Sequence, residues 1–205
     1  MIETVYVEKK IKEHPRTKFI LSKFKKATII EIDRYGEIFN KRNQNFRIQK
    51  KNPDLILAFK NDGYVLSAPE GFGIGSSKNY YFSHMYNCIY DCRYCFLQGM
   101  YSSANYVIFV NFEDFDKEIE KVIQDTKDNK TTFFSGYDCD SLALETLTGF
   151  AKHITTLFTK YPDVDIEFRT KSVQIEPFTS IEPLKNVIVA YSLLPDLISK
   201  SLDNK

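Results

Sequence analysis

Three of the four cysteines lie close together, as Cys88-Ile-Tyr-Asp-Cys92-Arg-Tyr-Cys95. Thiolates are the ligands that soft metals prefer, and three of them on one short loop can bind a single metal centre. Such a site leaves one coordination position to a fourth side chain or to an exogenous molecule. In a chain that we expect to be cytosolic, this spacing indicates a metal site rather than disulfide bonds.

Three interpretations of these thiols remain open at this point. Zinc is one, with His84 or Cys139 as fourth ligand, although structural zinc sites usually pair two separated C-x-x-C motifs. Three buried thiols without metal are another, but the polar residues Asp91 and Arg93 between the cysteines argue against it. The spacing favours a [4Fe-4S] cluster, whose fourth iron stays open for a chelating substrate or cofactor.

Composition places the chain among globular proteins. It has 205 residues, of which 43% are hydrophobic and 15% aromatic, and this is ample for a packed core. It contains no apolar run approaching the roughly 20 residues of a membrane span, and its start, MIETVYVEKK, lacks the apolar stretch of a signal peptide. We therefore expect a cytoplasmic protein without membrane contact.

Charge is distributed unevenly along the chain. Residues 1–60 carry 15 Lys and Arg against 7 Asp and Glu, whereas residues 61–205 carry 13 against 20. The basic part indicates either a nucleic-acid-facing region or a solvated helix face. The turn-rich stretch Pro69–Gly75 separates the two parts, and its Gly-x-Gly-x-Gly pattern has the wrong spacing for a dinucleotide site. We therefore predict a basic N-terminal α/β region, 1–75, and a second region, 76–205.

Hydrophobic periodicity predicts alternating strands and helices, with a polar and basic surface segment at 35–51. Such alternation is typical of a parallel α/β sheet or barrel. Lys171 then lies at the carboxyl end of a strand, where barrel active sites gather. The predicted strands are 4–8, 27–32, 80–86, 106–111, 131–135, 164–170 and 187–192, and the predicted helices are 15–26, 113–127 and 141–159.

The cysteine spacing, with the aromatic Tyr94 before the last cysteine and a strand upstream, resembles the signature of radical S-adenosylmethionine enzymes. The stretch Ser83–Gln98 is similar to the cluster loop of the spore photoproduct lyase family, and Val5-Tyr-Val and His14-Pro-Arg-Thr17 look similar as well. The resemblance covers nearly the whole chain and is weakest over residues 35–75. It implies a partial (β/α) barrel of the radical S-adenosylmethionine type with a small α/β N-terminal region.

This resemblance implies a reaction and its cofactors. Cys88, Cys92 and Cys95 would hold a [4Fe-4S] cluster whose open iron binds S-adenosylmethionine. One electron from a low-potential donor, such as ferredoxin or flavodoxin, would then give a 5′-deoxyadenosyl radical that abstracts hydrogen from the substrate. The implied substrate is a thymine dimer in ultraviolet-damaged DNA, which must leave the base stack to be repaired by this lyase chemistry.

The resemblance also implies roles for residues outside the cysteines. Tyr94 matches a catalytic and cofactor-binding aromatic position next to the adenine, although it could merely shield the cluster. Asp140 and Ser141 resemble a pair that helps hold S-adenosylmethionine, with a helix cap as the alternative. Lys171 and Ser192 match positions near the carboxylate and the ribose of the cofactor, and isolated polar surface residues are the alternative.

The hydrogen donor is less clearly indicated. Cys139 lies close to where the lyases carry the cysteine that returns hydrogen to the product radical. An ungapped comparison of the following helix sets Tyr137 there instead, so a donor and a buried thiol both remain open for Cys139. Phe96 departs from the family, which has a tyrosine at this point, and it has no phenol O–H to donate.

The second region also looks short. A (β/α) unit takes about 30 residues, so the stretch from Tyr80 to Lys205 supplies about four units, fewer than the family core has. We therefore expect a truncated chain that lacks the C-terminal part of the barrel. Two alternatives to the DNA-repair hypothesis stay open, namely the same radical chemistry on another substrate and a non-catalytic, zinc-stabilised nucleic-acid-binding module.

Overall fold

A computed structural model describes residues 2–204 of the chain. It forms two units. Unit 1 contains the residues up to Lys60, then Met85–Val110, and those from Leu194 onward, whereas unit 2 contains Asn61–His84 and Asn111–Leu193. The predicted boundary near residue 75 falls within unit 2. The division of the chain into a basic region, 1–75, and a barrel region, 76–205, stays a prediction.

Unit 1 is built on a five-stranded sheet with the order β2-β1-β3-β8-β6. All neighbours in it are parallel except β6 and β8, which are antiparallel. The central strand β3 is buried along its whole length, which is typical of a parallel sheet covered on both faces. The strands are β1 (Thr4–Glu8), β2 (Thr28–Ile32), β3 (Leu55–Ala58), β6 (Met85–Tyr86) and β8 (Tyr106–Phe109).

Short elements complete unit 1. Helix α1 (Pro15–Lys23) begins with a proline, a residue suited to the first helical position, and the Nδ1 atom of His14 accepts a hydrogen bond from the backbone N–H of Arg16. The other elements are η1 (Lys9–Ile11), α2 (Gly36–Phe39), α3 (Phe46–Gln49), β7 (Asp91–Cys92), α4 (Leu97–Met100), α9 (Asp196–Leu202) and β12 (Asp203–Asn204). The last of these pairs antiparallel with β7.

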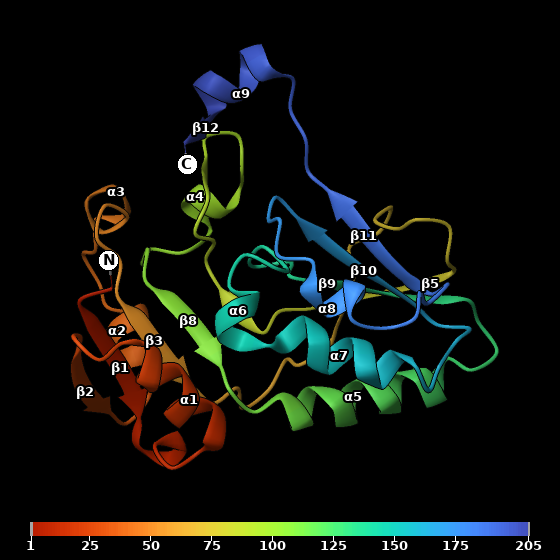
Figure 1. The fold of residues 1–205 in the computed structure, drawn as a ribbon, viewed down its shortest axis with the longest axis horizontal. Helices are drawn as coiled ribbons and strands as arrows, with labels where there is room; N and C mark the ends of the chain where they lie inside the picture. Colours follow the sequence, from red (N-terminus) through yellow and green to blue (C-terminus); the bar gives the residue numbers. More distant parts are fainter. Residues whose placement is uncertain (1, 205) are drawn as a thin grey trace. The chain divides into compact units, whose positions relative to one another are not determined.

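Unit 2 contains a second five-stranded sheet, with the order β11-β10-β9-β5-β4. Its strands are parallel except for the pair β4 and β5. Helices α5 and α7 lie on the same side of this sheet (Figure 1), where phenylalanines such as Phe133, Phe150 and Phe158 fill the core. The elements are β4 (Leu66–Ser67), β5 (Lys78–Phe82), α5 (Phe112–Asp125), β9 (Thr131–Ser135), α6 (Glu145–Thr148), α7 (Phe150–Phe158), β10 (Asp165–Thr170), α8 (Glu176–Thr179) and β11 (Val187–Tyr191).

The α/β fold class predicted from the sequence is confirmed. The two sheets are rich in parallel pairs, and within residues 2–204 they form no closed barrel. The predicted strand 80–86 is wrong as a single element, because the chain leaves β5 after Phe82 and starts β6 at Met85, in the other sheet. No helix within residues 2–204 is long and apolar enough to cross a membrane.

The predicted helix 141–159 is wrong in its extent. It consists of two helices that meet at Gly149, whose φ of +63° lies in the left-handed region. The carboxylate of Glu145 accepts hydrogen bonds from the backbone N–H groups of Ala151 and Lys152, at 2.8 and 3.0 Å. Hydrophobic periodicity continues across both helices, so it does not reveal the break that this side-chain cap stabilises.

The surface segment predicted at 35–51 is also more ordered than expected. It contains α2 and α3, and Phe39 at the end of α2 is buried with 2% of its surface exposed. Phe39 packs against the rings of Tyr35, Tyr86 and Tyr101. A single buried aromatic side chain therefore anchors a segment whose composition is otherwise polar and basic.

A buried histidine makes the stability of unit 2 dependent on pH. The ring of His84 stacks on Phe150, with centroids 4.0 Å apart and planes 6° apart, and its Nδ1 atom has no hydrogen-bond partner among the described residues. Burial lowers the pKa of His84 to about 3. The unfolded chain, with a histidine pKa of about 6.5, therefore binds more protons than the folded chain between these two values, and stability falls as the pH drops through this range.

We predict that the free energy of unfolding contributed by His84 falls by about 2 kcal/mol between pH 8 and pH 5, and that most of this loss occurs below pH 6.5. In His84→Phe, which keeps a stacked ring but cannot be protonated, the pH dependence of unfolding should be shallower by this amount. Urea denaturation at pH 8, 6.5 and 5 measures it, and pH 8 reports the packing change alone because His84 is neutral in both states there. Equal pH dependence in both proteins would contradict the prediction.

Candidate functional site

The cysteine loop of unit 1 is closed at its base by Asn87. This residue is buried and has a φ of +65°, a left-handed conformation that asparagine tolerates better than most residues. Its Nδ2 atom donates hydrogen bonds to the carbonyl oxygens of Ser103 and Asn105, at 2.8 and 2.7 Å. The loop that follows Asn87 is thus turned sharply away from β6 and tied to the segment that leads into β8.

The three loop cysteines lie on one short stretch, and none of them is in a disulfide bond. Cys92 is buried, whereas Cys88 and Cys95 are half-buried, and the backbone N–H of Cys95 donates to the carbonyl of Cys92 at 3.0 Å. Within residues 2–204, no three His, Cys, Asp or Glu side chains are arranged as a metal-binding group. The ligand set therefore stays a prediction. Three cysteines that share one partly accessible loop are nevertheless a donor set that suits an iron–sulfur cluster.

Two large aromatic side chains flank the last cysteine and are exposed. Tyr94 is 50% exposed and Phe96 is 59% exposed. Exposed aromatic surface is available for stacking on a planar ligand, which is the role predicted for Tyr94. This role of Tyr94 stays a prediction, with shielding of the metal site as the alternative.

A neighbouring segment, expected from the sequence to be plain surface, contacts the cysteine loop. The Nζ atom of Lys50 donates to the carbonyl oxygen of Cys88, and Arg47 forms an ion pair with Asp91 at 3.2 Å. The side-chain oxygen of Gln49 accepts from the backbone N–H of Ala104 at 2.6 Å. The only sequence signal for these contacts is that the basic stretch 40–51 lacks acidic residues, and this pattern by itself indicates no more than surface charge.

The remaining candidate residues follow the strands of unit 2. Strands β9, β10 and β11 are parallel, so their carboxyl ends share one edge of the sheet. In α/β folds this edge is where ligands bind. The predicted residues that follow the carboxyl ends of these strands are Cys139, Asp140, Ser141, Lys171 and Ser192.

The Asp140 carboxylate accepts three hydrogen bonds from its own chain. Its Oδ1 atom accepts from the Thr170 hydroxyl at 2.6 Å and from the Leu142 N–H at 2.9 Å, and its Oδ2 atom accepts from the Lys171 N–H at 2.7 Å. Asp140 thus ties the turn after β9 to the end of β10. The helix-cap alternative is wrong, because α6 begins only at Glu145 and takes no side-chain cap from the described residues.

Ser141 and Lys171 have similar positioning contacts. The buried Ser141 hydroxyl donates to the carbonyl of Ser135 at 2.7 Å and accepts from the N–H of Arg169 at 3.1 Å. The Nζ atom of Lys171 donates to the backbone carbonyl of Ser192 at 3.1 Å. The edge is therefore a hydrogen-bonded frame, and sequence reasoning missed Thr170 as the partner of Asp140.

The two candidates for hydrogen donor differ in their surroundings. The Cys139 side chain is buried, with 5% exposed. Tyr137 is half-buried, and its ring lies 4.3 Å from that of Tyr81 and 6.4 Å from that of Phe72. Both side chains belong to the turn after β9, so the choice between them stays a prediction.

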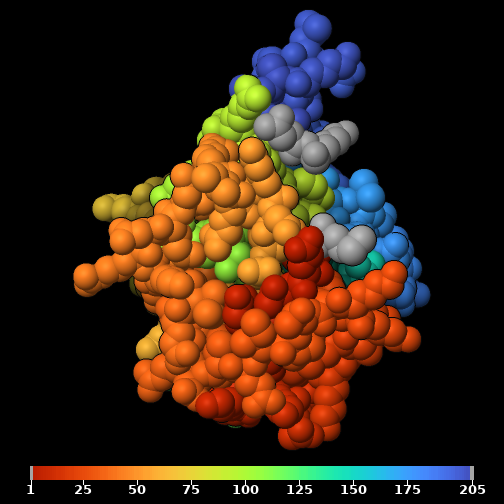
Figure 2. Space-filling model, turned by 90° about the vertical axis from the view of Figure 1, so that its left-hand side faces the viewer, coloured from red at the N-terminus to blue at the C-terminus, as the bar shows by residue number. Residues whose placement is uncertain are grey.

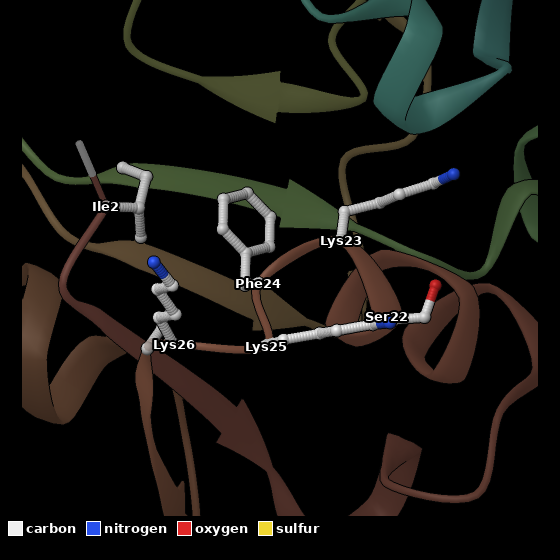
Figure 3. Close-up of a pocket in the computed structure, with 7 residues that line it drawn as sticks. Ile2, Ser22, Lys23, Phe24, Lys25 and Lys26 are labelled. Carbon is white, nitrogen blue, oxygen red and sulfur yellow. The ribbon is translucent and has the colours of Figure 1, made fainter.

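Unit 1 also contains a hollow of about 450 Å³ that the sequence did not predict. Figure 3 shows that its three lysines point in different directions rather than toward one point. Such divergent cations do not form a binding site for one anion. The lining residues are Ile2, Ser22, Lys23, Phe24, Lys25, Lys26 and Ala27.

Comparison with solved structures defines the fold. A spore photoproduct lyase mutant with bound AdoMet and dinucleoside spore photoproduct matches 99% of this chain with a TM-score of 0.84 and 17% sequence identity. A spore photoproduct lyase complexed with dinucleoside spore photoproduct matches 99% of it with a TM-score of 0.83 and 17% identity. The chain spans 59% of the length of each of these structures. The α/β fold is therefore the one seen in these lyases.

The family follows from the sequence itself. Residues 1–205 match the family model described as spore photoproduct lyase. The chain therefore belongs to the spore photoproduct lyase family, as the resemblance of its cysteine loop indicated. The comparison with curated proteins gave no match.

Gly136 provides a test of the frame after β9. It has a φ of +75°, and a Cβ atom there would lie 2.6 Å from the Ser141 Oγ atom and 2.9 Å from the Ser141 backbone nitrogen. We predict that Gly136→Ala lowers the free energy of unfolding by about 3 kcal/mol, because backbone strain and a close contact act together. Thermal or urea denaturation measures the loss.

Gly63→Ala is the matched control. Gly63 has a φ of +61° in the same unit, but an added Cβ atom would meet no heavy atom of the described residues within 4 Å. This substitution should cost about 1 kcal/mol, from backbone strain alone. Equal losses in the two variants would show that Ser141 does not fix the space around Gly136.

Proposed function

We propose that this chain provides the cofactor-binding part of a radical S-adenosylmethionine lyase that acts on an ultraviolet-induced thymine dimer in DNA. The observation that carries the proposal is the loop with three cysteines outside disulfide bonds, Cys88, Cys92 and Cys95, within a chain whose residues 1–205 match the family model. The fold shared with the solved lyases supports it.

In this proposal the three loop cysteines hold a [4Fe-4S] cluster and leave one iron for S-adenosylmethionine. Bound together, these cofactors supply a 5′-deoxyadenosyl radical that removes hydrogen from the substrate. The donor set fits the cluster, because it offers three thiolates and no fourth cysteine on the loop. Tyr94 presents an exposed ring that can stack on the cofactor adenine.

Asp140 and Ser141 act on the cofactor indirectly in this proposal. Their polar atoms are already engaged in hydrogen bonds to Thr170, Lys171 and Arg169, so they position the turn and the strand end. Lys171 and Ser192 stay the residues that we propose to contact the carboxylate and the ribose of the cofactor. A preorganised edge of this kind reduces the reorganisation needed when a ligand binds.

Cys139 is proposed as the source of the hydrogen that is returned to the product radical. A buried thiol has a weak S–H bond and is protected from solvent, which suits this role. Phe96 stands where a phenol would be expected and cannot relay hydrogen. The return of hydrogen would therefore depend on Cys139, or on Tyr137 if the ungapped comparison with the family is the right one.

The partners of the reaction belong to the same proposal. The two solved lyase structures described above hold a dinucleoside spore photoproduct, and one of them also holds AdoMet. For this chain we propose damaged DNA as substrate, with ferredoxin or flavodoxin as a low-potential electron donor and the cytoplasm as the location. The basic composition of residues 1–60 is compatible with contact to a phosphate backbone.

A second candidate is the same radical chemistry on a different substrate. The observation that favours it is Phe96, which replaces the tyrosine of the lyases and changes the chemistry beside the cluster. Release of 5′-deoxyadenosine without conversion of a dinucleoside spore photoproduct would support this candidate. The zinc-stabilised binding module is not favoured by the family match.

The cluster proposal predicts a specific loss of iron. After anaerobic reconstitution, the wild type should bind about four irons per chain, and its reduced spectrum should change when S-adenosylmethionine is added. Cys92→Ala should bind little iron and show no such change. Cys139→Ala is the matched control, because it removes a buried thiol outside the loop and should keep the full iron content. Tight binding of one colourless zinc by the wild type would overturn the proposal.

The donor proposal predicts a split between two products. Cys139→Ala should release 5′-deoxyadenosine at the wild-type rate and lower the yield of repaired thymine by roughly a factor of ten or more, because only the return of hydrogen is affected. Tyr137→Phe should keep both. The assay is chromatography of the two products after reaction with a dinucleoside spore photoproduct. The reverse pattern would assign the role to Tyr137.

A further inference from the structure

The segment that contains α3 forms a brace along the cysteine loop, and we define this brace as residues 45–50. The side chain of Asn45 begins it by accepting a hydrogen bond from the N–H of Ile48 at 3.1 Å. Three side chains then reach the loop or its continuation, from Arg47, Gln49 and Lys50. In Figure 2 the orange segment of the brace belongs to the face formed mainly by the first 60 residues.

Lys50 is the member of the brace that lies at the first cysteine. Its ammonium group donates to the carbonyl oxygen of Cys88 and lies 5.5 Å from the centre of the Tyr106 ring. The side chain is half-buried rather than extended into solvent. A lysine that is held in this way by a backbone carbonyl and an aromatic ring has a defined position, which a solvated surface lysine lacks.

Lys50 lies close enough to the first cysteine for its charge to act on the loop. Its ammonium group donates to the Cys88 carbonyl oxygen, and its side chain is partly shielded from solvent. Charges interact more strongly in such partly desolvated surroundings than they do in bulk water.

Asp91 does not cancel this charge. Its carboxylate is paired with Arg47 at 3.2 Å, so the brace supplies two cations against one anion on the loop. Arg47 lies on the exposed side of the brace, where solvent screens its effect. Lys50 is therefore the cation of the brace with the stronger influence on the thiolates.

We propose that Lys50 is a positioning residue that fixes the Cys88 end of the cysteine loop and raises the reduction potential of the cluster bound there. The proposal rests on the proposed function, because it concerns the cluster that Cys88, Cys92 and Cys95 would hold. Reduction adds a negative charge to the cluster, and a nearby cation stabilises the reduced form. Removal of this cation should make the cluster harder to reduce.

The first test measures the reduction potential of the reconstituted protein by spectroscopic redox titration. In Lys50→Met, the ratio of reduced to oxidised cluster at a fixed potential should fall about tenfold, which corresponds to about 59 mV for a one-electron couple. Lys50→Arg should restore most of the wild-type value because it restores the charge. Lys51→Met is the matched control, since it removes an exposed charge from the adjacent position, and it should leave the potential unchanged.

The second test needs no cluster. Hydrogen exchange of the apo protein, followed by mass spectrometry, should show faster exchange over residues 88–105 in Lys50→Met than in the wild type. Exchange in unit 2 and in Lys51→Met should match the wild type. This measurement also decides the positioning role if Lys50→Met folds but does not take up iron.

The outcomes separate this proposal from the proposed function. A wild-type protein that binds no cluster defeats the proposed function, and the exchange measurement then tests the brace alone. A wild-type potential in a fully loaded Lys50→Met overturns the electrostatic role. Unchanged exchange over residues 88–105 overturns the positioning role.

Discussion

The buried amide of Asn87 is the interaction on which the candidate metal loop depends. By donating to the carbonyls of Ser103 and Asn105, it closes the base of the loop that contains Cys88, Cys92 and Cys95. Both hydrogen bonds are shielded from water, so an apolar replacement would leave two buried carbonyl oxygens without this partner. The thiols can share one short loop because its two ends are held together.

The two units hold the backbone around their candidate residues in different ways. In unit 1, a loop that carries reactive thiols is held from outside by the brace and at its base by Asn87. In unit 2, the polar residues lie at the carboxyl edge of a parallel sheet, and the Asp140 carboxylate and the Ser141 hydroxyl bind neighbouring strand ends. Both arrangements fix backbone positions before any ligand is present, which lowers the cost of ordering a site on binding.

The sequence was most informative where residue type and spacing coincide. The cysteine spacing and its flanking residues led to the family, and the long parallel strands, such as β9 and β10, were placed within one or two residues. Buried strands and amphipathic helices give strong periodic signals, and these depend on neighbours that are close in sequence.

The features that the sequence did not reveal depend on single long-range contacts. The contact of Lys50 with Cys88 joins residues 38 positions apart, and that of Thr170 with Asp140 joins residues 30 apart. Lys50 and Thr170 are not part of any local sequence pattern, so the sequence alone does not indicate their contacts. The break at Gly149 was missed for a related reason. The side chain that accepts from the first N–H groups of α7 is Glu145, which stands four residues before Gly149 and not at the usual capping position.

The path of the chain through the two sheets has a consequence for biosynthesis. The sheet of unit 1 places β8 between β3 and β6, and the chain makes β4 and β5 of unit 2 before it reaches either β6 or β8. During synthesis, the edge of β3 that pairs with β8 therefore stays unpaired while β4 and β5 of the other sheet leave the ribosome. Neither unit is a contiguous gene segment, and recombination between relatives could exchange one of them intact only through several simultaneous crossovers.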